Sequence, residues 1–517
     1  MRRKPTPRYK LAFIGSYVET SIGSQAQPAM RTALMHEPMF CFGVNSTLPI
    51  DPSQVANQPN PPAASGSLRG SEALLGFNPS NPISEETTVI PPSEFELGRG
   101  QSEDANLGLY IDLSNVKNPQ PIRGGTTKPT DPGPRTEAYD RLNSDLFAPP
   151  PSDKGEVPNA KWPFGLSHNR HGLAGAGWAR SQNTNNLPIA TAMAGVDMRL
   201  EPNAYRELHW HVEGEWAFML NGSVRIASIN EAGQSFVDDV TEGDVWFFPP
   251  GVPHSLQAFD TGAEFLLIFN DGKFTEENTF LLSELMLRTP KSVIAKNFQT
   301  SVEKLDPLPK DQLWIFPGTK FNASISDPSQ NVTGPAGSIP KQTAYTYHLS
   351  QQKPLTVPGG SVKILDPVTF PVASTFSVAL VTVEPGAMRE MHWHTTSDEW
   401  SYFIEGQARV TVYQAPASSQ TFDFTAGDVG YVPKSNAHYL ENTGNTTLKF
   451  LEVLQASEYS DISVNQWLGL TPKQIIKDHL NLADDVIDNF PKTRSFIVQG
   501  NPDLTTTNFA PGEHGGA

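Results

Sequence analysis

Three histidines and one glutamate recur in two parts of this 517-residue chain at matching separations. The first set is His209, His211, Glu215 and His254, and the second set is His392, His394, Glu399 and His438. In each set the glutamate precedes the last histidine by 39 residues (254 − 215 and 438 − 399). Because successive side chains of a β-strand point to opposite faces, the two histidines of each His-x-His pair share one face and can bind one ion.

A single strand histidine is ordinarily a core or surface residue and no ligand. Here six of the chain's 12 histidines fall in the two sets, and the whole set is repeated, which favours metal binding. Three imidazoles and one carboxylate suit Mn, Fe, Ni or Zn, so these residues alone do not select the ion. An octahedral ion held by four such ligands keeps two positions open for other ligands.

The elements that must position these ligands are short strands. From Ile189 to Phe269, and again from Phe376 to Leu454, apolar stretches alternate with turns rich in Gly, Pro, Asn and Asp. This pattern is typical of an all-β sandwich or barrel. Each series is followed by a Thr-Pro pair, at Thr289 and Thr471, which predicts a short helix with Thr at the N-cap and Pro at the first helical position.

The repeat divides the chain into two main domains. Residues 1–134 are rich in Pro, Ser, Gly and Asn and show little periodicity, so we predict a largely disordered, low-complexity N-terminal tail. Residues 135–340 are predicted to form the first domain, with the stretch 135–185 wrapping around it. Residues 341–500 are predicted to form the second domain, and 501–517 a C-terminal tail.

Composition limits the partners. A net charge of −17 and a pI near 5.2 argue against nucleic acid or an anionic membrane as a partner, and no stretch is apolar enough to span a membrane. Cys41 is the only cysteine, so no intramolecular disulfide can form. A weak apolar stretch near the N-terminus and five N-x-S/T triplets suggest a secreted glycoprotein. These triplets begin at Asn45, Asn221, Asn322, Asn331 and Asn445.

The residues around the ligands resemble the cupin superfamily, and in particular the bicupin oxalate decarboxylases of fungal and bacterial type. The resemblance rests on the repeated Arg-Glu-x-His-Trp-His motif at Arg206 and Arg389 and on Ser463–Trp467, and it covers roughly residues 135–490. It implies two tandem jelly-roll β-barrels with short helical appendages, Mn(II) in both sites, and assembly as a homo-oligomer, either a trimer or a hexamer. Asn203 and Ser435 stand where the family has glycine, and neither change removes a ligand.

The resemblance also implies the catalytic groups. It assigns Arg206 and Arg389 to the binding of a small dicarboxylate. Each arginine lies three residues before the first histidine of its set, on the opposite face of a regular strand. A bulge or bend at the start of the strand would bring it into the site, as would an arginine that curls in from the mouth of the barrel.

One acidic residue is implied near each metal. Glu276, in a stretch that looks like the family's active-site lid, would be the general acid and base. The second copy has Ser457–Asp461 in place of that lid, and Glu452 lies where the family has a carboxylate near the second metal.

The implied activity is the conversion of oxalate to formate and CO2, with main turnover in the first site and with Mn(II) and dioxygen as cofactors. Two alternatives remain: a bicupin oxalate oxidase, which would use the same ligands to produce CO2 and hydrogen peroxide, and a storage-type bicupin without chemistry. Trp210 and Trp393, each between two ligands, would either couple the two sites electronically or only contribute to packing.

Overall fold

The computed structural model describes residues 110–111, 135–136, 152–320, 324–327 and 329–500. The predicted tails, 1–134 and 501–517, lie outside the described residues apart from β1 (Tyr110–Ile111), which pairs with β2 (Arg135–Thr136). None of the helices in the described ranges is long and apolar enough to cross a membrane.

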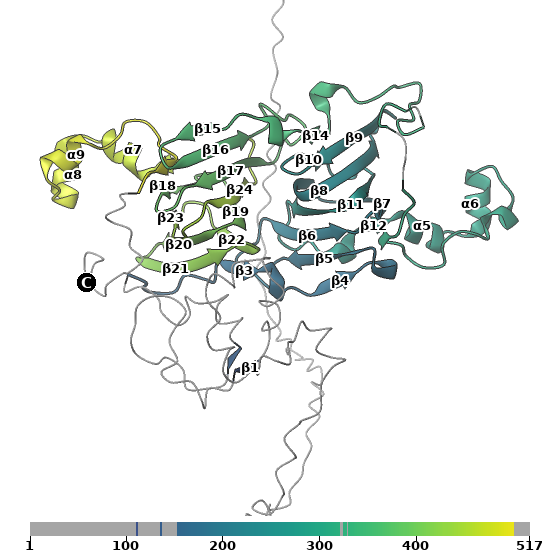
Figure 1. Cartoon of the computed structure of the whole chain (residues 1–517), viewed down its shortest axis with the longest axis horizontal. Coiled ribbons are helices and arrows are strands. Elements are labelled where there is room, and N and C mark those ends of the chain that lie inside the picture. Colours follow the sequence, from purple (N-terminus) through teal and green to yellow (C-terminus); the bar gives the residue numbers. More distant parts are fainter. Residues whose placement is uncertain (1–109, 112–134, 137–151, 321–323, 328, 501–517) are drawn as a thin grey trace, which may run out of the picture. The chain divides into compact units, whose positions relative to one another are not determined.

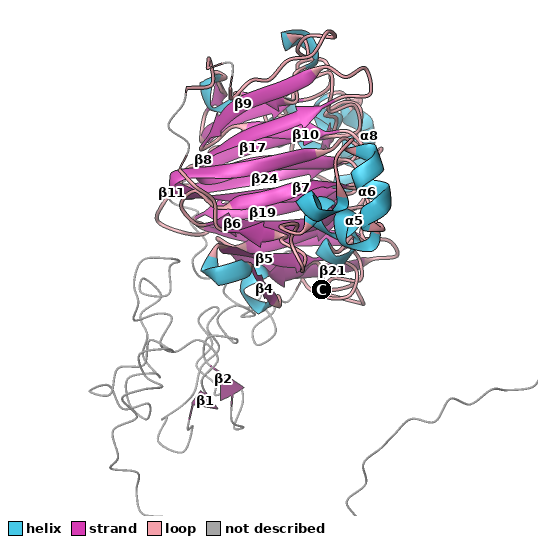
Figure 2. Cartoon of the chain, turned by 90° about the vertical axis from the view of Figure 1, so that its right-hand side faces the viewer, coloured by secondary structure: helices cyan, strands magenta, loops and turns pink. Residues whose placement is uncertain are grey.

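The first copy is an antiparallel β-barrel. Its strands are β4 (Asn169–His171), β5 (Gly177–Gln182), β6 (Ala194–Leu200), β7 (Tyr205–Trp210), β8 (Glu215–Ile229), β9 (Ser235–Thr241), β10 (Val245–Phe248) and β11 (His254–Phe269). They run in the order β10-β8-β11-β6-β5-β4, with β9 beside β8 and β7 beside β11 (Figure 2). The long strand β8 turns at Gly222, whose φ is 78° and whose added Cβ would lie 2.1 Å from the Gly262 carbonyl oxygen. This position therefore requires glycine.

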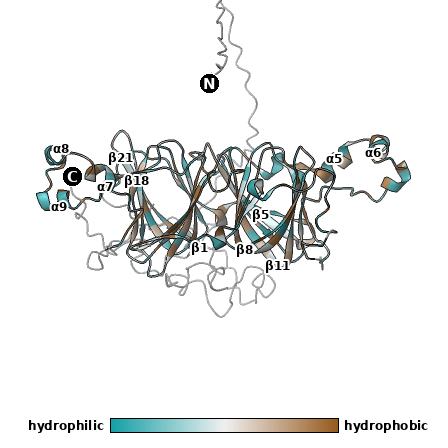
Figure 3. Cartoon of the chain, turned by 90° about the horizontal axis from the view of Figure 1, so that it is seen from above, coloured by the Kyte–Doolittle hydropathy of each residue, from teal (hydrophilic) through white to brown (hydrophobic). Residues whose placement is uncertain are grey.

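The second copy repeats the barrel as two sheets. Its strands are β15 (Leu355–Val357), β16 (Gly360–Leu365), β17 (Ser377–Val383), β18 (Met388–Trp393), β19 (Glu399–Glu405), β20 (Gln407–Gln414), β21 (Ser418–Thr425), β22 (Asp428–Val432), β23 (Ala437–Asn442), β24 (Leu448–Leu454) and β25 (Ile462–Ser463). One sheet has the order β15-β16-β17-β24-β19-β22, and the other β21-β20-β23-β18-β25. Seen from above, the strands of each copy close around their own interior (Figure 3). The predicted all-β fold of two cupin barrels is confirmed.

Each barrel takes a short strand from the other half of the chain. Strand β3 (Lys161–Pro163) pairs with β22 of the second barrel, and β14 (Thr346–Tyr347) pairs with β10 of the first. The prediction that residues 135–185 wrap the first domain is therefore wrong for 161–163. The apolar residues of these segments indicate burial but not which barrel buries them.

One apolar cluster joins the two barrels. It includes Trp216 and Phe247 from the first barrel and Trp400 and Tyr431 from the second. The Trp400 indole Nε1 donates a hydrogen bond of 2.7 Å to Gln182 Oε1, so the buried polar atom of this tryptophan is satisfied across the interface.

A helical appendage follows each barrel (Figure 1). The helices are α5 (Leu282–Arg288) and α6 (Lys291–Asn297) in the first copy, and α7 (Val464–Gly469), α8 (Lys473–Leu480) and α9 (Asp484–Asp488) in the second. The chain then returns to the metal-binding strand as β13 (Ile315–Phe316) on β7 and β26 (Ile497–Val498) on β18. The predicted caps are wrong by one residue, because Pro290 and Pro472 are themselves the N-caps. The hydroxyls of Thr289 and Thr471 instead donate to carbonyls of the preceding helix.

The join between the barrels can be tested at Gly195, where an added Cβ would lie 2.4 Å from the Trp400 ring. We expect Gly195→Ala to lower the free energy of unfolding by about 1–3 kcal/mol, because the ring is fully buried and cannot move aside without cost. Gly334→Ala is the matched control, since a Cβ there meets nothing within 4 Å. Equal midpoints for both variants in thermal denaturation would contradict this account.

Candidate metal centres and active site

The structure brings each predicted ligand set together inside its own barrel. In both sets the potential ligand atoms lie within 4.8 Å of one another, and all eight residues are buried. The first His-x-His pair lies at the end of β7, Glu215 begins β8 and His254 begins β11. The second set is built in the same way from β18, β19 and β23.

Backbone carbonyls orient most of the imidazoles. The Nδ1 atoms face carbonyl oxygens in five cases: His209 to Glu207 at 2.6 Å, His254 to Val252 at 2.9 Å, His392 to Glu390 at 2.7 Å, His394 to Ser460 at 2.9 Å and His438 to Asn436 at 3.0 Å. Because a carbonyl can only accept a hydrogen bond, Nδ1 carries the proton. Each Nε2 then presents a lone pair, as a metal ligand must.

The lone pairs make a buried cation the natural occupant. Glu399 Oε2 lies 2.9 Å from Nε2 of both His394 and His438, and Glu215 Oε2 lies 3.1 Å from His211 Nε2. Among the described residues, Nε2 of His211 and of His254 and Oε2 of Glu215 are buried without a hydrogen-bond partner. Lone pairs that face one another in a buried site repel unless a cation lies between them, so the donor set fits a divalent transition metal.

Burial also keeps the first histidine of each set neutral. Desolvation holds the pKa of His209 and of His392 well below the ordinary histidine value, and the arginine three residues earlier lowers each pKa further. Metal binding to these imidazoles therefore needs no proton to be displaced at neutral pH.

A β-bulge in the metal-binding strand turns Arg206 into the site. His209 is opposite His254, and Arg206 is opposite Leu256. The paired positions are therefore three residues apart on β7 but only two residues apart on β11. Strand β18 has the same irregularity, with Arg389 opposite Leu440 and His392 opposite His438. Both arginines are fully buried, and each is close enough to the first histidine of its set to lower the pKa of that histidine. Of the two routes that the sequence left open, both copies therefore use the bulge.

The bulges also bury two glutamates to which we assigned no role from the sequence. Glu207 accepts hydrogen bonds from Ser283 N at 2.9 Å, from Leu313 N at 3.1 Å and from Trp314 N. Glu390 accepts equivalent bonds from Ser463 Oγ, Ser495 N and Phe496 N. Each glutamate thus fastens the appendage and the returning chain to the metal-binding strand. The only signal in the sequence was the repeated Arg-Glu pair.

Glu276 lies against Arg206 and is not a solvated loop residue. It begins the short helix η7 (Glu276–Asn278), where the Thr275 side chain caps Glu277 N. Its Oε2 accepts hydrogen bonds of 3.0 Å from Arg206 Nη2 and from Trp314 Nε1. Its Oε1 is buried and has no partner among the described residues. One oxygen of a fixed carboxylate is therefore free to accept or donate a proton.

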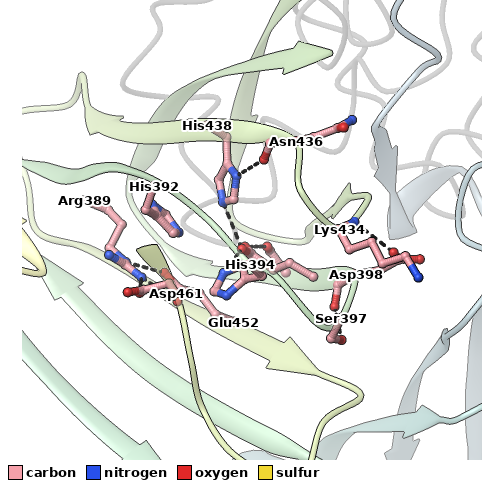
Figure 4. A network of polar contacts seen from close by, with 12 residues as sticks. Arg389, His392, His394, Ser397, Asp398, Lys434, Asn436, His438, Glu452 and Asp461 are labelled. Carbon is pink, nitrogen blue, oxygen red and sulfur yellow. Dashed lines mark hydrogen bonds and ion pairs between the residues drawn. The ribbon is translucent and has the colours of Figure 1, made fainter. Parts of the chain in front are cut away.

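The second site surrounds its arginine with more negative charge (Figure 4). Arg389 donates to Glu452 Oε1 at 2.9 Å, to Asp461 Oδ2 at 2.6 Å and to the Tyr459 hydroxyl at 3.1 Å. Asp461 also accepts a bond of 2.5 Å from Arg494. The sequence indicated Glu452 but not Asp461, which faces Arg389 as Glu276 faces Arg206.

The surroundings of the two arginines shift their pKa values in opposite directions. Burial lowers the pKa of Arg206, and Glu276 with its neighbours offsets only part of that effect. Burial opposes the charge of Arg389 as well, but Glu452, Tyr459 and Asp461 raise its pKa well above the ordinary value. The Arg206 charge is therefore less compensated than that of Arg389, and it is the better partner for an anionic ligand.

Comparison with known proteins supports this description. The family described as Cupin matches residues 166–306 and 347–488. The chain is 46% identical over 383 residues to oxalate decarboxylase OxdC of Bacillus subtilis, which covers 74% of this chain and 97% of that protein. It is 39% identical over 359 residues to a probable oxalate decarboxylase of Arthroderma benhamiae, with 69% of this chain and 87% of that protein covered.

Solved structures agree with the sequence relatives. The structure of the Bacillus subtilis oxalate decarboxylase at pH 4.6 superposes with a TM-score of 0.70 at 46% identity, covering 74% of this chain and 98% of that chain. Another structure of that enzyme, from work on its Mn(II) centres, gives a TM-score of 0.70 at 45% identity and covers 74% and 100%. This chain belongs to the cupin family, as a two-barrel member of its oxalate decarboxylases.

Proposed function

We propose that this protein converts the oxalate monoanion to formate and CO2, mainly in the first barrel. The observation that carries the proposal is the buried pair of Arg206 and Glu276 beside a complete set of three histidines and one glutamate. A small dicarboxylate needs a cation for the carboxylate that the metal does not bind, and arginine binds carboxylates in two-point geometry. Arg206 meets that need.

Glu276 would move the proton. In the overall reaction the oxalate monoanion becomes formate and CO2, so the proton that leaves an oxalate oxygen returns to the carbon that keeps its carboxylate. One carboxylate can take the proton before the carbon–carbon bond breaks and return it afterwards. The unpartnered Oε1 of Glu276 supports this role. Glu276 and Thr279 of the segment 275–279 are buried, and their burial beside Arg206 would keep water away from the reacting carbon.

We propose two Mn(II) ions per chain, with dioxygen as a further cofactor. The choice of manganese rests on the Mn(II) centres of the Bacillus subtilis relative and on the buried ligand sets of this chain. Bound Mn(II) would supply Lewis-acid and one-electron chemistry to a coordinated oxalate.

The second site would have a structural or electron-transfer role. Arg389 donates from Nε, Nη1 and Nη2 to groups of the protein, which leaves this guanidinium poorly suited to a second dicarboxylate. Trp210 stacks on Phe280 and Trp393 lies edge-on to Trp467, contacts that suit either packing or electronic coupling. A storage role is disfavoured because all eight ligands are present and buried.

Replacement of Glu276 tests the proton transfer. We expect Glu276→Ala to reduce formate production from oxalate by roughly 10²–10⁴-fold, because no positioned acid remains to protonate the carbon. Hydrogen peroxide should rise instead, through the oxidase reaction in which oxalic acid and dioxygen give two molecules of CO2 and one of hydrogen peroxide. Glu458→Ala, at an exposed position in the corresponding stretch of the second copy, should match the unmodified enzyme. Unchanged formate output from Glu276→Ala would exclude Glu276 from the mechanism.

Metal content tests the two sites separately from turnover. We expect about two manganese ions per chain after equilibration with Mn(II), and one fewer in Glu215→Gln or in Glu399→Gln. Removal of the metal by a chelator should lower the thermal midpoint, since a ligand at 100 times its Kd stabilises the folded state by about 2.7 kcal/mol. Elemental analysis and calorimetry give both results. A protein that binds no transition metal would favour the storage alternative.

We further propose that the chain is a secreted glycoprotein that assembles as a homotrimer or hexamer. The appendages support assembly, because they expose apolar side chains at Leu285, Val293, Phe298, Trp467, Leu470 and Ile475. Such patches commonly mark interfaces. Light scattering should give a mass of three or six chains, and the double variant Leu470→Glu with Phe298→Glu should have a lower mass.

A glycosidase-sensitive mass shift, with exposed Asn221 and Asn445 as acceptors, would support secretion.

A further inference from the structure

An aromatic ring lies between two arginines in each copy. In the first, the Trp314 ring lies 5.7 Å from the Arg206 guanidinium and 4.1 Å from that of Arg170. In the second, the Phe496 ring lies 5.7 Å from Arg389 and 4.1 Å from Arg494. Both aromatic residues have a positive φ, 49° for Trp314 and 62° for Phe496. The two rings therefore hold equivalent places, and they differ in one respect: only the indole can donate a hydrogen bond.

The outer arginine of the first copy reaches the segment 275–279, which we call the lid segment. Arg170 lies on β4, with its Nη1 atom 3.4 Å from Glu277 Oε1 and its Nη2 donating to Gln312 Oε1 at 3.3 Å. Its guanidinium stacks on the same indole that donates to Glu276. Two adjacent carboxylates of the lid segment are thus bound by two residues that contact each other.

We propose that Arg170 and Trp314 form a clasp that positions the lid segment over the first metal site. Trp314 sets the orientation of the Glu276 carboxylate through the indole N–H, and Arg170 restrains the segment through Glu277 while it supports the ring. Both are positioning residues. The consequence for product choice rests on the proposed function, whereas the clasp itself does not.

The exposure of the two contacts gives them different strengths. Trp314 is 3% exposed, so its hydrogen bond to a buried carboxylate is protected from water. The Arg170 and Glu277 side chains are 21% and 78% exposed, so their ion pair contributes little and breaks easily. The clasp therefore combines a fixed orienting contact with a weak one that can release.

The second copy has neither an indole that donates to the carboxylate nor an exposed ion pair that can release. Arg494, the counterpart of Arg170, pairs with Asp461, whose side chain is fully buried and is also bound by Arg389. Phe496 offers no donor to that carboxylate. A buried carboxylate held by two arginines is costly to separate from them, so this arrangement is closed rather than releasable. The difference agrees with turnover in the first site.

Hydrogen exchange of the lid segment tests the clasp without oxalate. In the full-length, Mn(II)-loaded protein, we expect exchange in a peptide that spans Phe274–Phe280 to be about 2–5-fold faster in Arg170→Gln and in Glu277→Gln. Trp314→Phe, which reproduces the aromatic residue of the second copy, should exchange about tenfold faster or more, because a bond to a charged group is lost. The double variant Arg170→Gln with Glu277→Gln should be no faster than Arg170→Gln alone.

Asp260→Asn is the matched control, because it removes one charge from an exposed ion pair with Lys320 on the same barrel. It should leave lid exchange unchanged. Equal exchange in wild type, Arg170→Gln and Glu277→Gln would overturn the clasp, and these two variants decide the question even if Trp314→Phe fails to fold.

The products formed from oxalate provide the second measurement. If the clasp positions Glu276, the ratio of formate to peroxide should fall in the same order as lid exchange rises, with Trp314→Phe most affected. A role in folding alone would lower total turnover without changing that ratio, and an unchanged ratio would overturn the positioning role. If the wild type forms no formate, the proposed function fails, while the exchange data still decide whether the clasp exists.

Discussion

The β-bulge in each metal-binding strand is the constraint on which both sites depend. A regular strand would put the arginine of the Arg-Glu-x-His-Trp-His motif on the face away from the histidines. The extra residue moves Arg206 and Arg389 to the side of the ligands and buries Glu207 and Glu390 in the same step. Those glutamates then bind the chain that returns from the appendage. One backbone irregularity therefore positions the metal ligands, the arginine and the wall of the site together.

The duplicated barrels show how identical ligands can support unequal sites. The metal donors and the bulge are the same in both copies, and so are the carbonyl partners of two histidines in each set. The difference lies in the charge around the arginine: Arg206 faces one carboxylate that enters from the lid segment, whereas Arg389 faces Glu452 and Asp461, both buried. A fully compensated guanidinium has little affinity left for an anion. The first site therefore suits substrate binding, and the second suits a stable, closed structure.

The joint between the barrels explains why two copies make one stable unit. Strands β3 and β14 each complete the barrel of the other copy, and Trp400 bonds to Gln182 within the shared apolar cluster. Burial of large aromatic rings across this interface stabilises both barrels at once. The metal sites therefore rest on a framework that neither copy forms from its own residues alone.

The sequence by itself determined the eight metal ligands, the repeat and the all-β class, because strand alternation and fixed ligand spacing are local properties. It also indicated that a bulge was one of two ways to bring Arg206 and Arg389 into their sites, and that Asn203 could replace a glycine, which its φ of 63° agrees with. Only the tertiary structure decided that β3 and β14 exchange barrels, that Asp461 faces Arg389, and that Trp314 binds Glu276. These contacts join residues far apart in the chain, and no periodic pattern encodes which distant partner a buried side chain meets.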